Sequence, residues 1–124
     1  MRSVKVLLAD DSAVMRNAIR LFLENRSDIL LVGEAENLNE AVRKAQQLRP
    51  DVVVFDLHLS ERCEQAQWNS IFGQAKLLAI TFGIDDRSKA LAQHIGIEKL
   101  TDKINLSEEL VPAILELVPD GRPN

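Results

Sequence analysis

Five residues scattered along the chain have side chains suited to phosphoryl transfer: Asp10, Asp11, Asp56, Thr81 and Lys103. Gathered carboxylates would repel, because two like charges ~4 Å apart cost roughly 4 kcal/mol at an effective dielectric constant of about 20. A cation must therefore join them. Hard oxygen ligands suit Mg²⁺, and the two histidines and one cysteine of the chain form no zinc-like cluster. A carboxylate beside Mg²⁺ can accept a phosphoryl group while a lysine neutralises charge, so we expect an aspartyl-phosphate site.

Short apolar stretches alternate with longer segments of helical periodicity, and these stretches could position the five side chains. The expected strands cover residues 4–9, 29–34, 52–55, 77–82 and 97–100. The alternation is typical of parallel βαβ units, and the wholly apolar run 52–55 is typical of a central strand covered on both faces. We therefore predict an α/β fold: a doubly wound (βα)5 flavodoxin-like three-layer sandwich with a parallel sheet in the order 2-1-3-4-5.

This strand order predicts where the reactive side chains meet. Ligands of such sheets bind outside the carboxyl ends of the strands, where the direction of winding switches. The first and third strands are neighbours in this order, so Asp10 and Asp11 should lie beside Asp56. Thr81 and Lys103 follow the fourth and fifth strands and should lie at the same edge.

Local signals predict where the five helices begin and end. Polar capping residues precede the helices, and glycines follow two of them. The signals are Asp11 or Ser12 for the first helix, Asn37 with Glu40 for the second, Gly73 after a third near 61–72, Asp85 or Asp86 and Gly96 around the fourth, and Ser107 for a last helix containing Pro112. The third helix has the least regular apolar spacing of the five.

The composition is that of one globular domain. The chain has 124 residues, of which 46% are hydrophobic and 27% are charged, and we expect a domain at 1–118 followed by a linker-like tail at 119–124. A net charge of −4 without a basic cluster argues against direct nucleic-acid binding by this segment. The apolar runs are far shorter than the ~18 residues of a membrane span, and a single cysteine fits a reducing cytoplasm.

The motifs resemble the receiver domain of two-component response regulators over residues 3 to 118. The matching stretches are Val6 to Asp11, Pro50 to Leu57, Thr81, and Gly96 followed by Lys103. The segments 32–35 and 110–114 most resemble those of the subfamily whose receiver precedes a helix-turn-helix DNA-binding domain. The resemblance thus implies a signalling switch rather than an enzyme, and transcriptional control through an output domain outside this segment.

The resemblance also implies a role for each site residue. Asp56 would be the phosphoacceptor, supplied by a histidine kinase or phosphotransfer protein. Asp10, Asp11 and Asp56, together with the backbone carbonyl of His58, would arrange Mg²⁺. Thr81 would be the hydroxyl that follows the phosphoryl group, and Lys103 its ion-pair partner. A homodimer would form through the face made by the fourth helix, the fifth strand and the last helix.

Four positions depart from the family pattern: Leu100 replaces an aromatic switch residue, Ile104 and Ser60 replace prolines, and Phe82 replaces a small residue. These departures leave open a second hypothesis, a degenerate receiver that acts as a phosphorylation-independent interaction module. A third hypothesis, an aspartyl-phosphate phosphatase of the dehalogenase type, ranks last. Such an enzyme would need an acid two residues after its nucleophile, where His58 stands.

Overall fold

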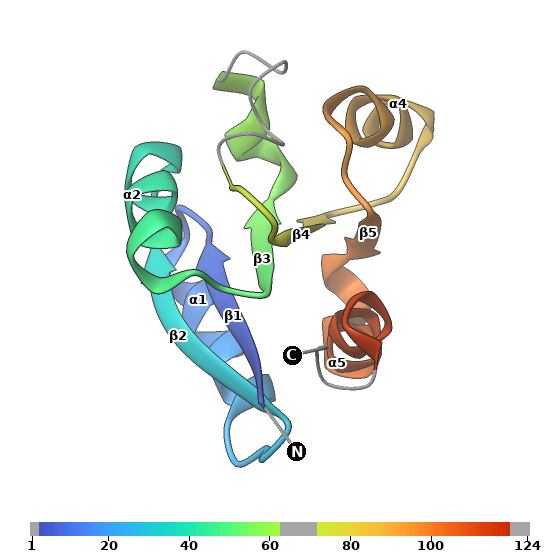
Figure 1. Cartoon of the computed structure of the whole chain (residues 1–124). Coiled ribbons are helices and arrows are strands. Elements are labelled where there is room, and N and C mark those ends of the chain that lie inside the picture. The colour runs from blue at the N-terminus through green and yellow to red at the C-terminus, as the bar shows by residue number, and fades with distance from the viewer. Residues whose placement is uncertain (1–2, 63–71, 120–124) are drawn as a thin grey trace.

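The computed structural model describes residues 3–62 and 72–119, in which five strands form one sheet in the order β2-β1-β3-β4-β5 (Figure 1). The strands are β1 (Val4–Ala9), β2 (Ile29–Ala35), β3 (Val52–Asp56), β4 (Lys76–Thr81) and β5 (Lys99–Asp102). Every neighbouring pair is parallel. The predicted α/β fold and its strand order are therefore confirmed.

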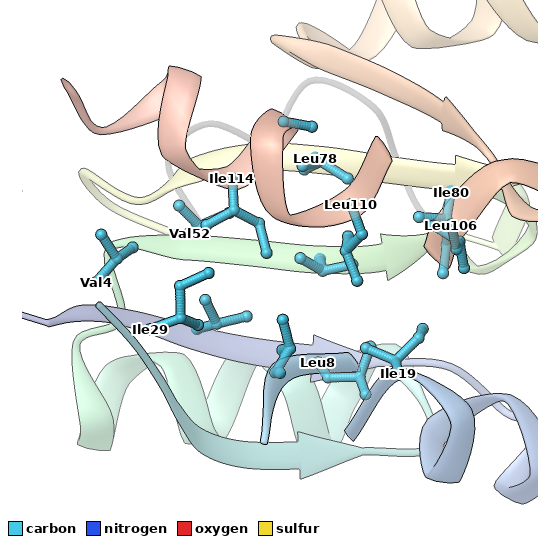
Figure 2. Packing of buried hydrophobic residues seen from close by; sticks show 14 of the residues in the cluster. Val4, Leu8, Ile19, Ile29, Val52, Leu78, Ile80, Leu106, Leu110 and Ile114 are labelled. Atoms are coloured by element: carbon cyan, nitrogen blue, oxygen red, sulfur yellow. The ribbon is translucent and has the colours of Figure 1, made fainter. Parts of the chain in front are cut away.

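Helices cover both faces of the sheet. They are α1 (Ala13–Leu23), α2 (Leu38–Leu48), α4 (Asp86–Ile95) and α5 (Leu106–Leu117). Apolar residues of α1 and α5 pack against one face, and those of α2 and α4 pack against the other, which makes a three-layer sandwich. Figure 2 shows Leu110 and Ile114 of α5 over the part of the sheet that carries Val52 and Leu78.

The central strand β3 is buried at every position. Val52 and Val54 belong to the core beneath α1 and α5, whereas Val53 and Phe55 belong to the core beneath α2. Alternate side chains of a strand point to opposite faces, so a strand covered on both faces must be apolar throughout. Packing on both sides fixes the backbone that ends in Asp56.

Most predicted helix starts are confirmed. Ser12 Oγ accepts the Met15 N–H at 3.1 Å before α1, and Asn37 Oδ1 accepts the Glu40 N–H at 2.8 Å before α2. Asp85 and Ser88 form a reciprocal capping box before α4, and Gly96 ends that helix with φ 80°. These side chains satisfy backbone N–H groups that have no partner within their helix.

Boundaries predicted for the last two strands and the last helix are wrong. The fourth strand ends at Thr81 rather than at Phe82, and the fifth covers Lys99–Asp102 rather than 97–100. The fifth strand starts later because the Ile97 N–H bonds the Ala92 carbonyl at 2.9 Å and completes the end of α4. Ser107 does not cap α5. The chain enters this helix through a 3-10 turn (Lys103–Asn105), so the helix starts at Leu106 and Ser107 lies within its first turn.

The predicted third helix near 61–72 falls largely on residues 63–71, which lie outside the described residues. After β3 the described chain forms a 3-10 helix (Leu57–Arg62), and Gly73 adopts φ 65°. The tail predicted at 119–124 also lies outside the described part from residue 120 onwards. Within residues 3–62 and 72–119, no helix is both long and apolar enough to cross a membrane.

Candidate functional site

The predicted site residues come from the carboxyl ends of four strands. Ala9 of β1 pairs with Phe55 of β3, so the two strands end side by side, and Asp10 and Asp56 follow in step. On the other side of β3, Asp56 pairs with Ile80 of β4. When neighbouring parallel strands end side by side, their C-terminal residues lie together at one edge of the sheet. The sheet therefore brings together segments that are distant in sequence.

Three carboxylates gather at this edge. Oxygen atoms of Asp10, Asp11 and Asp56 all lie within 4.8 Å of one another. Asp10 and Asp56 are buried, whereas Asp11 is exposed to solvent. Buried like charges at such distances repel strongly, so the cluster needs compensating positive charge.

Lys103 supplies part of that charge. Its Nζ lies 2.7 Å from Asp56 Oδ2 and 3.1 Å from Asp10 Oδ2, and its side chain is only 6% exposed. Burial alone would lower the pKa of Lys103, but its hydrogen bond to Asp56 and the charges of Asp56 and Asp10 raise this pKa above its usual value. The lysine therefore stays protonated and holds the two buried carboxylates together.

Backbone N–H groups orient the two buried carboxylates. The Ser12 N–H donates to Asp10 Oδ1 at 2.8 Å, and the His58 N–H donates to Asp56 Oδ1 at 2.9 Å. The second oxygen of each carboxylate faces Lys103. Burial raises the pKa of Asp10 above its usual value, although the Ser12 N–H and the Lys103 ammonium partly offset this effect.

The cluster fits a hard divalent cation. Among the described residues, Asp10 Oδ2 is the one buried side-chain oxygen or nitrogen without an aligned hydrogen bond, even though Lys103 Nζ lies 3.1 Å away. A buried oxygen of this kind beside two further carboxylates is the donor set that Mg²⁺ binds in proteins. Asp10, Asp11 and Asp56 would hold the ion. A contribution from the His58 carbonyl stays a prediction.

Thr81 and Phe82 complete this edge. Thr81 is buried, ends β4 and pairs in register with Asp102 of β5. Phe82 is 64% exposed, and its ring centroid lies 5.1 Å from Lys103 Nζ. The sequence pattern flagged Phe82 only as a bulky residue near the predicted phosphoryl site, whereas the structure gives it a cation–π contact with the site lysine.

The other departures from the family pattern are accommodated locally. Ser60 is buried, and its hydroxyl donates to the Leu57 carbonyl at 2.6 Å, which closes the turn after β3. Leu100 is partly buried and packs against the core beneath α2 and α4. Ile104 is 73% exposed and follows Lys103 through a trans peptide bond.

The sequence patterns missed an arginine that supports the acid pair. Arg16 Nη1 donates to the Asp10 carbonyl at 2.5 Å, and its Nε lies 3.5 Å from Glu34 Oε1. Arg20 joins the same glutamate through two hydrogen bonds of 2.8 and 3.0 Å. The spacing of Arg16 and Arg20 puts them on one helical face and could have signalled a shared acidic partner. These contacts anchor the segment between β1 and α1 that carries Asp10 and Asp11.

This arrangement suits nucleophilic attack by a carboxylate on a phosphoryl group. Asp56 is fixed by β3 and by the His58 N–H, and Lys103 lies beside it to neutralise incoming negative charge. Phosphoryl transfer depends mainly on positioning and on charge neutralisation, and both are present at this edge. No described histidine or cysteine joins the carboxylate cluster.

Comparison with known proteins agrees with this geometry. A model of the response regulator receiver domain matches residues 6–65. The response regulator protein VraR of Staphylococcus aureus is 30% identical over 115 residues, which cover 90% of this chain and 55% of VraR. The chain therefore spans a little over half the length of the curated relatives it matches.

Solved structures share the fold. A two-component response regulator of the LuxR family from Aurantimonas sp. SI85-9A1 has a TM-score of 0.80 and 28% identity, over 93% of this chain and 84% of that chain. A response regulator protein from Burkholderia pseudomallei, solved with a phosphorylated aspartic acid and a calcium ion, has a TM-score of 0.72 and 21% identity, over 89% and 65% of the two chains. The matching sequence, strand order and acidic edge place this chain in the response regulator family, as a receiver domain.

Proposed function

We propose that this receiver domain accepts a phosphoryl group on Asp56 in a Mg²⁺-dependent reaction and acts as a signalling switch. The observation that carries the proposal is the contact of Lys103 Nζ with both Asp56 and Asp10, 2.7 and 3.1 Å away, within a cluster of three carboxylates. A purely structural ion pair would not need a third acidic group beside it. The excess of negative charge suits a cation and a phosphoryl group arriving together.

The proposed chemical step uses groups already in position. A carboxylate oxygen of Asp56 forms a bond to phosphorus, and the bond from phosphorus to the donor atom breaks. That bond's electron pair leaves with the donor, which is a histidine nitrogen of a kinase or the leaving oxygen of a small phosphodonor. Lys103 neutralises charge on the phosphoryl oxygens, and bound Mg²⁺ would supply further neutralisation.

The surrounding biology is inferred from the family. The phosphoryl donor is a histidine kinase or phosphotransfer protein, and the setting is the cytoplasm. Thr81 would respond to the phosphoryl group and alter the α4, β5 and α5 face, through which a homodimer would form. Control of transcription would then pass through an output domain outside the segment 1–118. Switching of this kind requires the phosphoryl group to favour one of two arrangements that already coexist.

Mass spectrometry after incubation with acetyl phosphate and Mg²⁺ tests the proposal. We expect the wild-type protein to gain the mass of one phosphoryl group, because Asp56 is buried beside its neutralising lysine. Asp56→Asn should gain none, since an amide oxygen is a poor nucleophile. The matched control is Asp51→Asn, which changes a buried aspartate at the opposite end of β3 and should still be phosphorylated.

The same experiment decides between the proposal and the interaction-module hypothesis. Equal mass gain in wild type and Asp56→Asn would mean that phosphorylation occurs elsewhere. No gain in the wild type, together with dimerisation that is the same in Asp56→Asn, would favour a degenerate receiver. Retention of the full acidic cluster and of Lys103 supports the phosphoryl-accepting function instead.

A further inference from the structure

Two short segments beside the site are joined beyond the end of the β-ladder. Thr81 of β4 and Asp102 of β5 form the last paired position of these strands. After it, Asp102 Oδ1 accepts two backbone hydrogen bonds, from the Gly83 N–H at 3.3 Å and from the Ile104 N–H at 3.0 Å. One carboxylate therefore links the segment that follows Thr81 to the turn that contains Lys103.

A side-chain contact joins the same two segments. The Phe82 ring centroid lies 5.1 Å from Lys103 Nζ. The negative face of an aromatic ring attracts an ammonium group, so this contact favours the position in which Lys103 reaches Asp56. Phe82 lies between Thr81 and Gly83, and Lys103 lies between Asp102 and Ile104. The two contacts thus connect residues 81–83 with residues 102–104.

We propose that Asp102 and Phe82 are positioning residues that hold Lys103 on Asp56 and make the Thr81 and Lys103 segments move together. The proposal rests on the proposed function of Asp56. Lys103 begins a 3-10 turn of three residues, none of which is buried as a whole residue, and Ile104 is 73% exposed, so packing gives the backbone of this turn little support. Asp102 and Phe82 supply that support from the neighbouring segment.

A simpler reading gives Asp102 only a local role. As the residue before the 3-10 turn, it accepts the Ile104 N–H in the manner of an N-cap, and this contact needs nothing from β4. The bond from Gly83 is different, because it crosses between segments that are 19 residues apart in sequence. The two readings differ in what they predict for the Gly83 amide and for Lys103.

Substitution of Asp102 tests whether its carboxylate links residues 81–83 to residues 102–104. Asp102→Ala removes the acceptor, and Asp102→Asn is the matched control that keeps an acceptor oxygen. We expect the initial rate of phosphorylation by acetyl phosphate to fall about tenfold in Asp102→Ala, and to stay within about twofold of wild type in Asp102→Asn. Mg²⁺ affinity, measured by calorimetry, should change little in either variant, because the three metal-binding carboxylates are untouched.

Substitution of Phe82 tests the ring contact separately. Phe82→Leu keeps an apolar side chain without an aromatic face, whereas Phe82→Tyr keeps the face. We expect the phosphorylation rate to fall about threefold in Phe82→Leu and to be restored in Phe82→Tyr. The Lys103 Nζ resonance in NMR spectra should shift in Phe82→Leu and stay near its wild-type position in Phe82→Tyr.

Amide hydrogen exchange tests the link between residues 81–83 and residues 102–104 without phosphorylation. In Asp102→Ala, the Gly83 and Ile104 amides should both exchange faster, and the Lys103 Nζ resonance should shift. Faster exchange at Ile104 alone, with an unchanged Lys103 resonance, would show a local cap and overturn the proposal. Parallel losses of Mg²⁺ affinity and melting temperature would also overturn it, since they indicate general damage. If the wild type gains no phosphoryl group, the function proposed for Asp56 fails. These NMR measurements still show whether Asp102 links the two segments.

Discussion

The two ends of β3 carry buried aspartates whose surroundings differ. Asp51 lies just before the strand, where its Oδ2 accepts the Lys5 N–H at 2.8 Å. Its own N–H bonds the Lys5 carbonyl, and its carbonyl accepts the Lys76 N–H at 2.9 Å. Asp51 therefore joins the beginnings of β1, β3 and β4, and its carboxylate accepts a backbone hydrogen bond from β1.

Asp56, at the other end of β3, lies among charged side chains. It shares Lys103 with Asp10, and Asp11 completes the group of three carboxylates. Both Asp51 and Asp56 are buried, so burial alone does not distinguish the carboxylate that we propose as the phosphoacceptor. Both carboxylates accept a backbone N–H, but only Asp56 belongs to the described cluster of three carboxylates, and such a group of like charges suits a bound cation.

Magnesium binding should give the largest difference between substitutions at the two ends of β3. A ligand at about 100 times its Kd stabilises the folded state by about 2.7 kcal/mol if it binds only that state. We expect Mg²⁺ to stabilise the wild-type protein by this amount, and a chelator to remove the effect. Urea denaturation with and without Mg²⁺ measures the change. Asp11→Asn should lose most of the stabilisation, because this exposed carboxylate belongs to the cluster.

The control for that experiment is Asp51→Asn at the opposite end of β3. It should keep the Mg²⁺-dependent stabilisation, whatever its stability without the ion. An equal Mg²⁺ effect in wild type and Asp11→Asn would contradict the assignment of the metal-binding carboxylates. Loss of the effect in Asp51→Asn would erase the distinction between the two ends.

Loss of the Asp51 carboxylate should affect stability rather than chemistry. Asp51→Ala leaves the Lys5 N–H of β1 without this acceptor, which should cost about 1–3 kcal/mol of unfolding free energy. Asp51→Asn keeps an acceptor oxygen and should cost less. Urea denaturation gives the free energies, and mass gain with acetyl phosphate reports the chemistry. A folded Asp51→Ala protein that cannot be phosphorylated would show that this end of the strand also serves the site.

The regular part of the fold follows from sequence because its signals are local and repeated. The apolar run Val52 to Phe55 indicated a strand buried on both faces, and it lies at the centre of the sheet. Parallel connectivity then restricted the strand order and brought Asp10, Asp11 and Asp56 to one edge. The side chains of the cluster could be predicted because each one directly ends or follows a strand.

Details that depend on contacts between distant segments could not be predicted from local patterns. Ile97 looked like a strand residue, but its N–H completes the end of α4. Ser107 looked like a helix cap, but a 3-10 turn feeds directly into α5. The sequence patterns did not single out Asp102, whose Oδ1 accepts the N–H of Gly83, 19 residues away in the chain. Contacts of this kind leave no periodic signal in the sequence.

The smallest expected effect belongs to Glu98, which lies near the same edge of the sheet as Asp51. Glu98 Oε1 accepts the Leu77 N–H at 3.0 Å, and Oε2 lies 3.7 Å from Lys76 Nζ in a solvent-exposed pair. Glu98→Ala should lower the unfolding free energy by about 1 kcal/mol through the lost hydrogen bond. Glu98→Gln removes only the ion pair and should cost less than about 0.5 kcal/mol.

Urea denaturation of both Glu98 variants, with the phosphorylation rate as a second readout, completes this test. Equal costs for Glu98→Gln and Glu98→Ala would mean that charge matters at this edge more than the backbone hydrogen bond does. The phosphorylation rate should match that of wild type in both variants, because Glu98 precedes β5 and the carboxylate cluster lies beyond the carboxyl ends of β1 and β3. A changed rate would mean that charges at the two ends of the parallel strands are coupled through the sheet. The amino ends of the strands would then affect the chemistry as well as the stability.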